Sequence, residues 1–197
     1  MMNLKKSLEL YLIRHGKTPG NEEKRYVGRT EESLSKKGRE ELLQKKLPEA
    51  QMLFSSPMKR AIESCECLFP GKKVVMIPAF REIDFGDFEG KNYQELSENK
   101  EYQAWIDSGG TMPFPHGEGR DTFIQRSLEG YEEMLCLLRK SDVERAAAVV
   151  HGGTIMAILS AVYGGDYYDY QILNGEGYLL RMVLEDKDFR ILSVERS

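Results

Sequence analysis

Short apolar runs recur along the chain and alternate with longer amphipathic stretches. Residues 7–13 (SLELYLI) alternate and are rich in large apolar side chains, a pattern that predicts a β-strand. Further short apolar runs predict strands at residues 51–55, 73–77, 145–150, 178–184 and 189–195. The last two runs flank the polar residues 185–188, and we therefore expect them to form a hairpin.

The amphipathic stretches between these runs predict helices. They cover residues 35–47, 56–69, 121–140 and 154–163, with one or two short helices between residues 93 and 107. Ser35, Ser56 and Asp121 are residue types that cap helix N-termini, which places the starts of three of these helices. Residues 80–90 lack a clean period and residues 108–119 are rich in glycine and proline, so both are predicted to be irregular.

The alternation of strands and helices predicts a three-layer α/β/α fold with a mostly parallel sheet and helices on both faces. A chain of 197 residues is long enough for a substantial core, and we expect a single domain over residues 1–197. Residues 80–119 are expected to form an insertion that lies over one end of the sheet and covers the functional site.

Charge and hydropathy argue against several classes of protein. The formal net charge is -4, from 28 basic and 32 acidic residues, which argues against general nucleic-acid binding. No run approaches the roughly 20 apolar residues of a membrane span. Residues 1–13 carry Glu9 inside a short apolar run and do not resemble a signal peptide, so we expect a cytoplasmic protein without nucleic-acid or membrane partners.

The three cysteines, Cys65, Cys67 and Cys136, do not predict a disulfide framework, because their number is odd in a chain of this length. Cys65 and Cys67 have the spacing of a metal or redox pair. Both fall in the amphipathic stretch 61–68, however, and the chain has no second pair of ligands. We therefore interpret them as helix residues and predict neither a metal nor a cofactor.

Basic and imidazole side chains follow three of the predicted strands. Residues 14–16 (RHG) come directly after the first strand, Arg60 lies near the start of the helix after the second, and residues 151–153 (HGG) follow the fourth. The carboxyl ends of parallel strands meet at one edge of a sheet, where ligands bind. Helix N-termini at the same edge present free N–H groups. The sequence therefore predicts an anion pocket whose size suits a phosphoryl group.

Four segments carry a resemblance to a known family. They are residues 14–18 (RHGKT) together with Asn21, residues 55–61 (SSPMKRA), Arg81-Glu82 within residues 80–90, and residues 151–153 (HGG). These segments extend over nearly the whole chain, and in this order and spacing they resemble the histidine phosphatase superfamily, also called phosphoglycerate mutase-like. The resemblance implies the α/β fold of that family and transfer of a phosphoryl group to a histidine.

The resemblance implies that His15 is the nucleophile that attacks phosphorus. A ring nitrogen can attack only when the imidazole is neutral, and burial beside Arg14 and Arg60 would lower the pKa of His15 enough to keep it neutral. Arg14 and Arg60 would bind the phosphoryl oxygens, since a planar guanidinium can donate two hydrogen bonds at once and stays charged.

Three further residues complete the implied phosphate site. His151 would stabilise charge on the transferring group, and the backbone N–H of Gly152 would be a second donor. Asn21 could add a neutral donor to the phosphate, although an asparagine that follows Gly20 is equally typical of a turn.

Glu82 would protonate the oxygen of the leaving alcohol. An alkoxide leaves slowly, and a general acid typically contributes roughly 10²- to 10⁴-fold to the rate. The apolar neighbours of Glu82 could raise its pKa enough for it to hold that proton. Three other carboxylates, Asp84, Asp87 and Glu89, are close in the sequence, and the choice of Glu82 over them depends on the resemblance.

Within the family, the short chain and the absence of tryptophan from residues 26–35 favour the phosphatases over the longer mutases. Residues 28–38 and 115–118 look similar to the branch that dephosphorylates α-ribazole 5′-phosphate, whereas Glu31 and residues 39–40 depart from its pattern. Short phosphatases of broad specificity share much of the same pattern.

We therefore predict a metal-independent phosphomonoesterase for a small phosphorylated metabolite, either α-ribazole 5′-phosphate or a broader set of phosphomonoesters. The alternatives are a cofactor-dependent phosphoglycerate mutase and a non-catalytic phospholigand-binding module, although such a module would be expected to lack His15 or Glu82. His116 could contact the substrate or face solvent. The sequence allows a homodimer.

Overall fold

In the computed structural model, which describes residues 5–185 and 188–197, a six-stranded sheet has the strand order β3-β2-β4-β1-β5-β6. The strands are β1 (Lys6–Arg14), β2 (Met52–Ser55), β3 (Val74–Met76), β4 (Arg145–Val150), β5 (Gly177–Leu184) and β6 (Phe189–Arg196). β1 to β4 run parallel, and β5 and β6 add two antiparallel strands at one edge. The predicted mostly parallel sheet is confirmed. The predicted hairpin turn includes positions 186 and 187, which lie outside the described residues.

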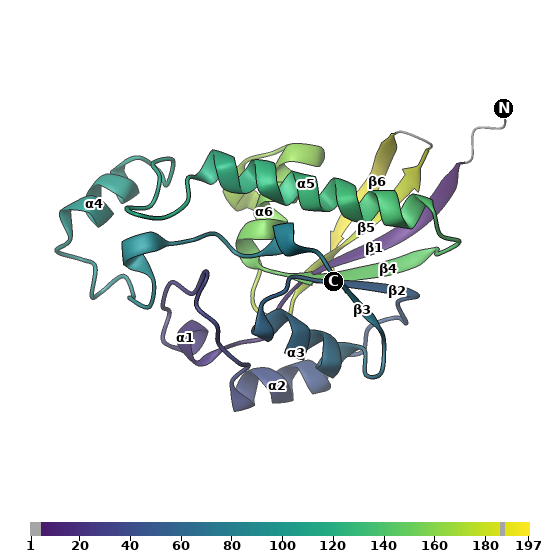
Figure 1. The fold of residues 1–197 in the computed structure, drawn as a ribbon, viewed down its shortest axis with the longest axis horizontal. Coiled ribbons are helices and arrows are strands. Elements are labelled where there is room, and N and C mark those ends of the chain that lie inside the picture. The colour runs from purple at the N-terminus through teal and green to yellow at the C-terminus, as the bar shows by residue number, and fades with distance from the viewer. Residues whose placement is uncertain (1–4, 186–187) are drawn as a thin grey trace.

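Helices cover both faces of this sheet. They are α1 (Pro19–Glu22), α2 (Lys36–Leu43), α3 (Lys59–Leu68), α4 (Lys100–Asp107), α5 (Arg120–Arg139) and α6 (Gly152–Val162), with short 3₁₀ turns η1 (Pro78–Phe80), η2 (Gly86–Phe88) and η3 (Tyr167–Tyr170). Helices α5 and α6 lie on one face, and α2 and α3 lie on the other (Figure 1). This arrangement confirms the predicted α/β/α class.

Strand β1 is buried from both sides because its side chains alternate between the two helical layers. Leu8, Leu10 and Leu12 pack into the cluster beneath α5 and α6, whereas Tyr11 and Ile13 pack into the cluster beneath α3. Burial of each such side chain stabilises the fold by about 1.5–3 kcal/mol. The core therefore holds β1 rigidly, and with it the chain that leaves its carboxyl end.

Residues 80–119 connect η1 to α5 and carry a small core of their own. Helix α4 lies at the opposite end of the molecule from the start of β1 (Figure 1). The buried members of this core are Ile83, Phe88, Leu96, Tyr102, Phe114, Phe123 and Ala157, the last two from α5 and α6. The segment is therefore packed against the helical layer, although it contains little regular structure.

The helix start predicted at Ser56 is wrong. Helix α3 begins at Lys59, with Met58 as its N-cap. The Ser56 hydroxyl accepts a hydrogen bond from the Met58 N–H and lies 2.7 Å from Nε2 of His151, so it closes a turn before the helix. The Lys59 N–H instead donates to the carboxylate of Glu31 at 2.9 Å. A side chain from a distant loop thus satisfies the free donor that a local cap was expected to satisfy.

Two other helix boundaries differ from the prediction. Gly119 is the N-cap of α5, and Asp121 lies in the first turn, where its negative charge suits the helix dipole. Helix α2 begins after the predicted cap Ser35 but ends at Leu43. The predicted extension to Leu47 fails because a residue before proline disfavours the α conformation, and Leu47 packs against the core beneath α3.

Some short elements were not predicted. Helix α1 and the 3₁₀ turn η3 each contain 4 residues, too few for a hydrophobic period to be recognised. Helix α6 begins at Gly152 rather than at Thr154, with His151 as its N-cap. The N-terminus of α6 therefore lies immediately beside His151.

Candidate active site

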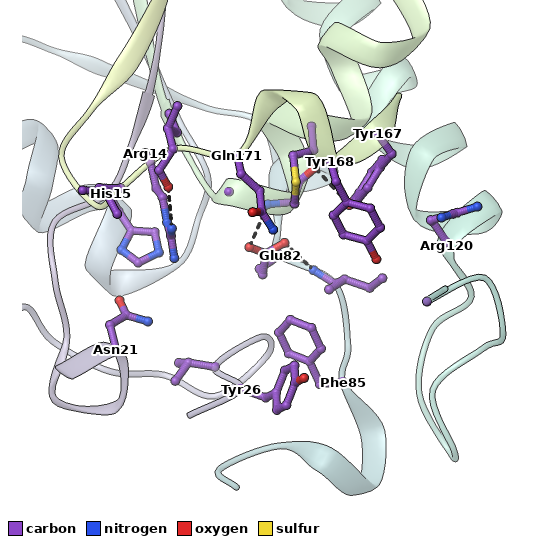
Figure 2. Close-up of a pocket in the computed structure, with 18 of the residues that line it drawn as sticks. Arg14, His15, Asn21, Tyr26, Glu82, Phe85, Arg120, Tyr167, Tyr168 and Gln171 are labelled. Carbon is purple, nitrogen blue, oxygen red and sulfur yellow. Dashed lines mark hydrogen bonds between the residues drawn. The ribbon is translucent and has the colours of Figure 1, made fainter. Parts of the chain in front are cut away.

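A pocket of about 750 Å³ opens at the carboxyl ends of β1 and β4. Arg14 and His15, at the end of β1, lie at one side of it, and Glu82 lies near its middle (Figure 2). Gly152 and Gly153 bring the N-terminus of α6 to the same wall. Parallel strands thus place their ends where the sequence predicted an anion site.

His15 is held with one ring nitrogen free. It is 3% exposed, and its Nδ1 lies 2.7 Å from the carbonyl oxygen of Gly16. Because a carbonyl can only accept, Nδ1 carries the proton and Nε2 keeps its lone pair. Burial, followed by the positive charges of Arg60 and Arg14, lowers the pKa of His15 well below 6.5. The imidazole is therefore neutral at neutral pH and able to act as a nucleophile.

His151 lies beside His15, with the two ring centroids 5.1 Å apart and the planes inclined at 64°. Its Nε2 lies 2.7 Å from the hydroxyl of Ser56, which already accepts the Met58 N–H and can donate its own proton to the ring. This contact is compatible with an imidazole proton on Nδ1, which is buried and has no partner among the described residues. Burial, then the charge of Arg60, lowers the pKa of His151 well below 6.5.

Arg60 is fully buried, and the loop of residues 27–30 holds its guanidinium. Nη1 donates to the Thr30 carbonyl at 2.8 Å, and Nη2 donates to the carbonyls of Gly28 at 2.6 Å and Val27 at 3.2 Å. Its Nε is buried without a partner in the described part of the chain. Three carbonyls thus fix the guanidinium plane and leave the Nε–H available as a charge-assisted donor for an anion.

Arg14 presents a second such donor from the end of β1. Its Nη1 donates to the Ile172 carbonyl at 2.7 Å, while its Nε is buried and lacks a partner within the described residues. Gly152 packs against it, since a Cβ at that position would lie 3.3 Å from Arg14 Nε. The Gly152 N–H is in the first turn of α6, where the helix offers it no acceptor.

The loop of residues 27–30 is itself held by Glu89. The Glu89 carboxylate accepts hydrogen bonds from the N–H groups of Gly28 at 3.0 Å and Arg29 at 2.8 Å, and from the Thr30 hydroxyl at 2.7 Å. The same loop supplies the carbonyls that hold Arg60. Glu89 is therefore linked to the phosphate side of the pocket through the backbone, although it does not line the pocket.

Asn21 has a defined amide orientation. Its Oδ1 accepts from the Thr18 N–H at 3.3 Å and from Nδ2 of Asn174 at 3.1 Å. Both interactions require the oxygen on that side, so the amide nitrogen of Asn21 is left to face the pocket. Asn174 also donates to the carbonyl of His15 at 3.2 Å, which couples the orientation of Asn21 to the backbone of the histidine.

Glu82 lies between His15 and the part of the pocket that is lined by Phe85 and Tyr168 (Figure 2). Its oxygens accept from the N–H groups of Ile83 at 3.0 Å and Gly153 at 3.3 Å. Burial raises the pKa of Glu82, against these hydrogen bonds and the charges of Arg60 and Arg14, which lower it. A Cβ at Gly153 would lie 2.4 Å from Oε1, so a glycine is needed for the carboxylate to lie against the helix start.

The other loop carboxylates are committed elsewhere. Asp84 pairs with Arg29 at 3.1 Å, and Asp87 lies 2.9 Å from Nδ1 of His116. The side chain of His116 is 85% exposed and does not line the pocket, so of its two predicted alternatives the solvent-facing one holds.

The structure brings the predicted site residues together. Arg14, His15, Asn21, Glu82 and Gly152 line the pocket, while Arg60 and His151 are buried beside them. The pocket also has an aromatic lining, none of which was predicted as a site residue: Tyr26, Phe85, Trp105, Phe114, Tyr167 and Tyr168. These side chains come from separate segments without a common period, so no local pattern could have marked them.

Two absences apply to residues 5–185 and 188–197. No group of three or more histidine, cysteine, aspartate or glutamate side chains there could hold a metal ion. No helix in these ranges is both long and apolar enough to span a bilayer.

Comparison with known proteins agrees with this geometry. The chain belongs to branch 1 of the histidine phosphatase superfamily, which it matches over residues 10–195. The resemblance inferred from the sequence is thereby confirmed, and so is the expected class of enzyme, a phosphatase of the histidine type.

Individual relatives carry different substrates in their names. The metal-independent phosphoserine phosphatase of Arabidopsis thaliana is 30% identical over 165 residues, which are 76% of this chain and 66% of that protein. The α-ribazole phosphatase of Shigella flexneri has a similar structure, with a TM-score of 0.78 at 22% identity and coverage of 93% and 94%. A phosphoglycerate mutase of Thermus thermophilus has a TM-score of 0.71 at 28% identity, with coverage of 95% and 98%.

Proposed function

We propose that this enzyme hydrolyses phosphomonoesters through a phosphohistidine formed on His15, without a metal ion. The observation that carries the proposal is a neutral His15 with a free Nε2 beside the unpartnered Arg14 Nε, Arg60 Nε and His151 Nδ1 of the described chain. Phosphoryl transfer depends mainly on positioning and on stabilisation of charge. In the proposed site, fixed protein donors do what divalent cations do in other phosphotransferases.

In the first step, His15 Nε2 attacks phosphorus, a P–N bond forms and the P–O bond to the alcohol breaks. Arg14, Arg60 and His151 bind the phosphoryl oxygens as charge develops, with Asn21 as a neutral donor. The proton of Glu82 passes to the departing oxygen, so the product leaves as a neutral alcohol.

In the second step, water attacks the phosphohistidine. The Glu82 carboxylate accepts a proton from that water, the P–N bond breaks, and inorganic phosphate leaves with His15 neutral again. The raised pKa of Glu82 supports both roles, because a carboxyl group with a raised pKa takes up and keeps a proton more readily than a free one.

The substrate is a small phosphorylated metabolite, and α-ribazole 5′-phosphate is the candidate that both the loop sequences and the Shigella flexneri neighbour support. Phosphoserine is a second candidate substrate, because the Arabidopsis relative is named as a phosphoserine phosphatase. A panel of these two esters, 3-phosphoglycerate and sugar phosphates would rank them by kcat/KM. Release of inorganic phosphate from 3-phosphoglycerate supports a phosphatase, whereas conversion to 2-phosphoglycerate without phosphate release would support a mutase.

Metal independence has a simple test. We expect EDTA-treated enzyme to retain its full rate, because the proposed charge stabilisation comes from side chains and backbone N–H groups. The measurement is kcat/KM before and after chelation, with and without added Mg²⁺. A large loss that Mg²⁺ restores would contradict the proposal.

The role of Glu82 is tested by the leaving group. We expect Glu82→Gln to slow hydrolysis of alkyl phosphates roughly 10²- to 10⁴-fold, the usual contribution of a general acid. The same variant should slow p-nitrophenyl phosphate far less, because p-nitrophenolate leaves without a proton. Equal losses on both esters would rule out Glu82 as the acid.

A further inference from the structure

The half of the pocket beyond Glu82 has an aromatic wall. Phe85 is at its centre, with its ring centroid 5.0 Å from Tyr26 and 5.0 Å from Phe114. Trp105 continues the wall, 5.0 Å from Phe114 at an interplanar angle of 30°. All four side chains line the pocket.

A second apolar wall lies across the pocket. Tyr167 and Tyr168 of η3 contribute perpendicular rings 5.1 Å apart, and Met156 of α6 lies beside them. The two walls meet at Gly110, where a Cβ would lie 2.3 Å from the Tyr168 hydroxyl and 3.1 Å from the Trp105 ring. We call the space between these walls the aromatic cleft, and Figure 2 shows Tyr26 and Phe85 on one side of Glu82 and Tyr168 on another.

Two further arginines that line the pocket make contacts within the protein, and of the two only Arg25 is paired with carboxylates of the described chain. Arg25 forms ion pairs with Glu23 at 2.6 Å and with Glu95 at 2.7 Å. Arg196 donates to the carbonyl of Gln171 at 3.1 Å. Arg25 therefore offers little net charge to a carboxylate or a second phosphate on the substrate.

Arg120 also lines the pocket and lies over the ring of Tyr167, 5.7 Å from its centroid, a cation–π arrangement. Glu176 lines the same pocket and would repel a second anionic group on the substrate. The cleft thus combines aromatic surfaces with the guanidinium of Arg120 stacked on one of them.

We infer that the aromatic cleft binds a flat aromatic ring system carried by the alcohol portion of the substrate. The inference rests on the proposed function, because the position of Glu82 places the leaving oxygen between the phosphate donors and the cleft. Aromatic side chains stack on such rings or meet them edge to face, and exclude water around them. Small acidic esters such as phosphoserine would leave these surfaces exposed to water and would be poor substrates.

The test compares alkyl esters whose phosphate leaves from the same kind of carbon. We expect kcat/KM for 2-(2-naphthyl)ethyl phosphate to exceed that for ethyl phosphate and for phosphoserine by roughly 30- to 100-fold, the effect of burying one ring system. Similar values for all three esters would overturn the inference while leaving the phosphatase mechanism intact. A preference for phosphoserine that Arg120→Gln abolishes would overturn it in favour of a carboxylate site.

Variants on the two walls test the location. Phe85→Ala and Tyr168→Ala should each lower kcat/KM for the naphthyl ester by roughly 10-fold or more, from lost apolar contact. Both should lower the rate on ethyl phosphate far less, because that ester does not reach the cleft. The exposed Tyr163, outside the pocket, provides the matched control Tyr163→Ala, which should change neither rate. Equal losses on both esters in the wall variants would contradict the assignment.

A non-hydrolysable ligand separates this inference from the proposed mechanism. Calorimetry should show that 2-(2-naphthyl)ethylphosphonate binds the enzyme at least roughly 10-fold more tightly than ethylphosphonate, and that Tyr168→Ala removes the difference. Tighter binding without turnover of any ester would leave the cleft assignment standing and remove the hydrolytic mechanism. Equal binding of the two phosphonates would remove the cleft assignment, whatever the turnover.

Discussion

The two halves of the pocket are built in different ways. On the phosphate side, hydrogen bonds to backbone groups or to neighbouring polar side chains fix the site residues, such as Nη1 of Arg14 on the Ile172 carbonyl and Nε2 of His151 on the Ser56 hydroxyl. In the aromatic cleft, rings from four separate segments pack against one another, and few polar bonds fix them. The phosphate side is therefore over-determined, and the cleft is held mainly by packing.

This difference separates chemistry from selectivity. A phosphoryl group requires donors at fixed positions, and strand ends and helix starts supply them with little freedom. Apolar recognition tolerates changes of shape, because volume-conserving substitutions in packed regions have small effects. Changes on the phosphate side should therefore lower kcat/KM for all esters by similar factors. Changes in the cleft should instead alter the ranking of the esters by kcat/KM.

The largest effect should come from the nucleophile. We expect His15→Ala to lower kcat/KM by roughly 10⁴-fold or more on every ester, because no other group can form the covalent intermediate. His116→Ala is the matched control, since that histidine is exposed and outside the pocket, and its rates should stay within about twofold. Substantial turnover by His15→Ala would contradict the assignment of His15 as the nucleophile on the phosphate side.

A smaller loss is expected from Arg60→Lys. Lysine cannot reproduce the guanidinium plane, so the carbonyls of Val27, Gly28 and Thr30 lose their shared donor. We expect kcat/KM to fall by roughly 10²- to 10³-fold, similar on ethyl and naphthylethyl phosphate. The exposed Arg39 provides the control Arg39→Lys. A fall in kcat/KM for only one of the two esters would show that Arg60 selects the substrate rather than stabilising the transferring phosphoryl group.

Glu89 should act on the phosphate side through Arg60. Glu89→Gln keeps one acceptor oxygen for the N–H groups of Gly28 and Arg29 but replaces the other, which accepts from the Thr30 hydroxyl, with an NH2 group. This loosens residues 27–30 and should lower kcat/KM by roughly 10- to 100-fold. In the Arg60→Lys background the same change should lower kcat/KM by less than about 3-fold, because residues 27–30 no longer hold a guanidinium there. The exposed Glu98 provides the control Glu98→Gln. Additive losses in the double variant would contradict the link.

The smallest effect concerns stability and pH. The pKa of Glu82 is raised in the folded state, so above pH 4.5 the unfolded chain loses its proton more readily and folding becomes less favourable. Glu82→Gln cannot ionise and should therefore raise Tm at pH 7.

That difference in Tm should vanish near pH 4, where the carboxyl is protonated in both states. Thermal denaturation in phosphate-free buffers measures it, since phosphate would bind the folded site. An equal or lower Tm for Glu82→Gln at pH 7 would show that burial does not hold the proton on Glu82.

The histidines and arginines of the phosphate side could be placed at one edge of the sheet because they lie at or near the ends of regular elements, and the family resemblance supplied their roles. His15 and His151 come at the ends of the buried strands β1 and β4, which their apolar composition marks, and parallel strands bring such ends to one edge. Arg60 could be placed near the same edge for this reason, although its helix begins later than Ser56 suggested.

The rest depends on contacts between distant segments. Glu31 satisfies the start of α3 and Glu89 holds residues 27–30, and nothing local to either glutamate distinguishes it from a solvated side chain. The aromatic cleft is a similar case, because Tyr26, Phe85 and Tyr168 become neighbours of one pocket only after the irregular segments have packed.

Trapping of the covalent intermediate tests the central claim most directly. Wild-type enzyme turning over ³²P-labelled naphthylethyl phosphate should be quenched in alkali within the first turnover, digested and analysed for bound label. We predict label that is stable in alkali and lost in acid, located on the peptide containing His15, and absent from His15→Ala. Rapid hydrolysis without any label on His15, under quench conditions in which a synthetic phosphohistidine standard survives, would contradict the account.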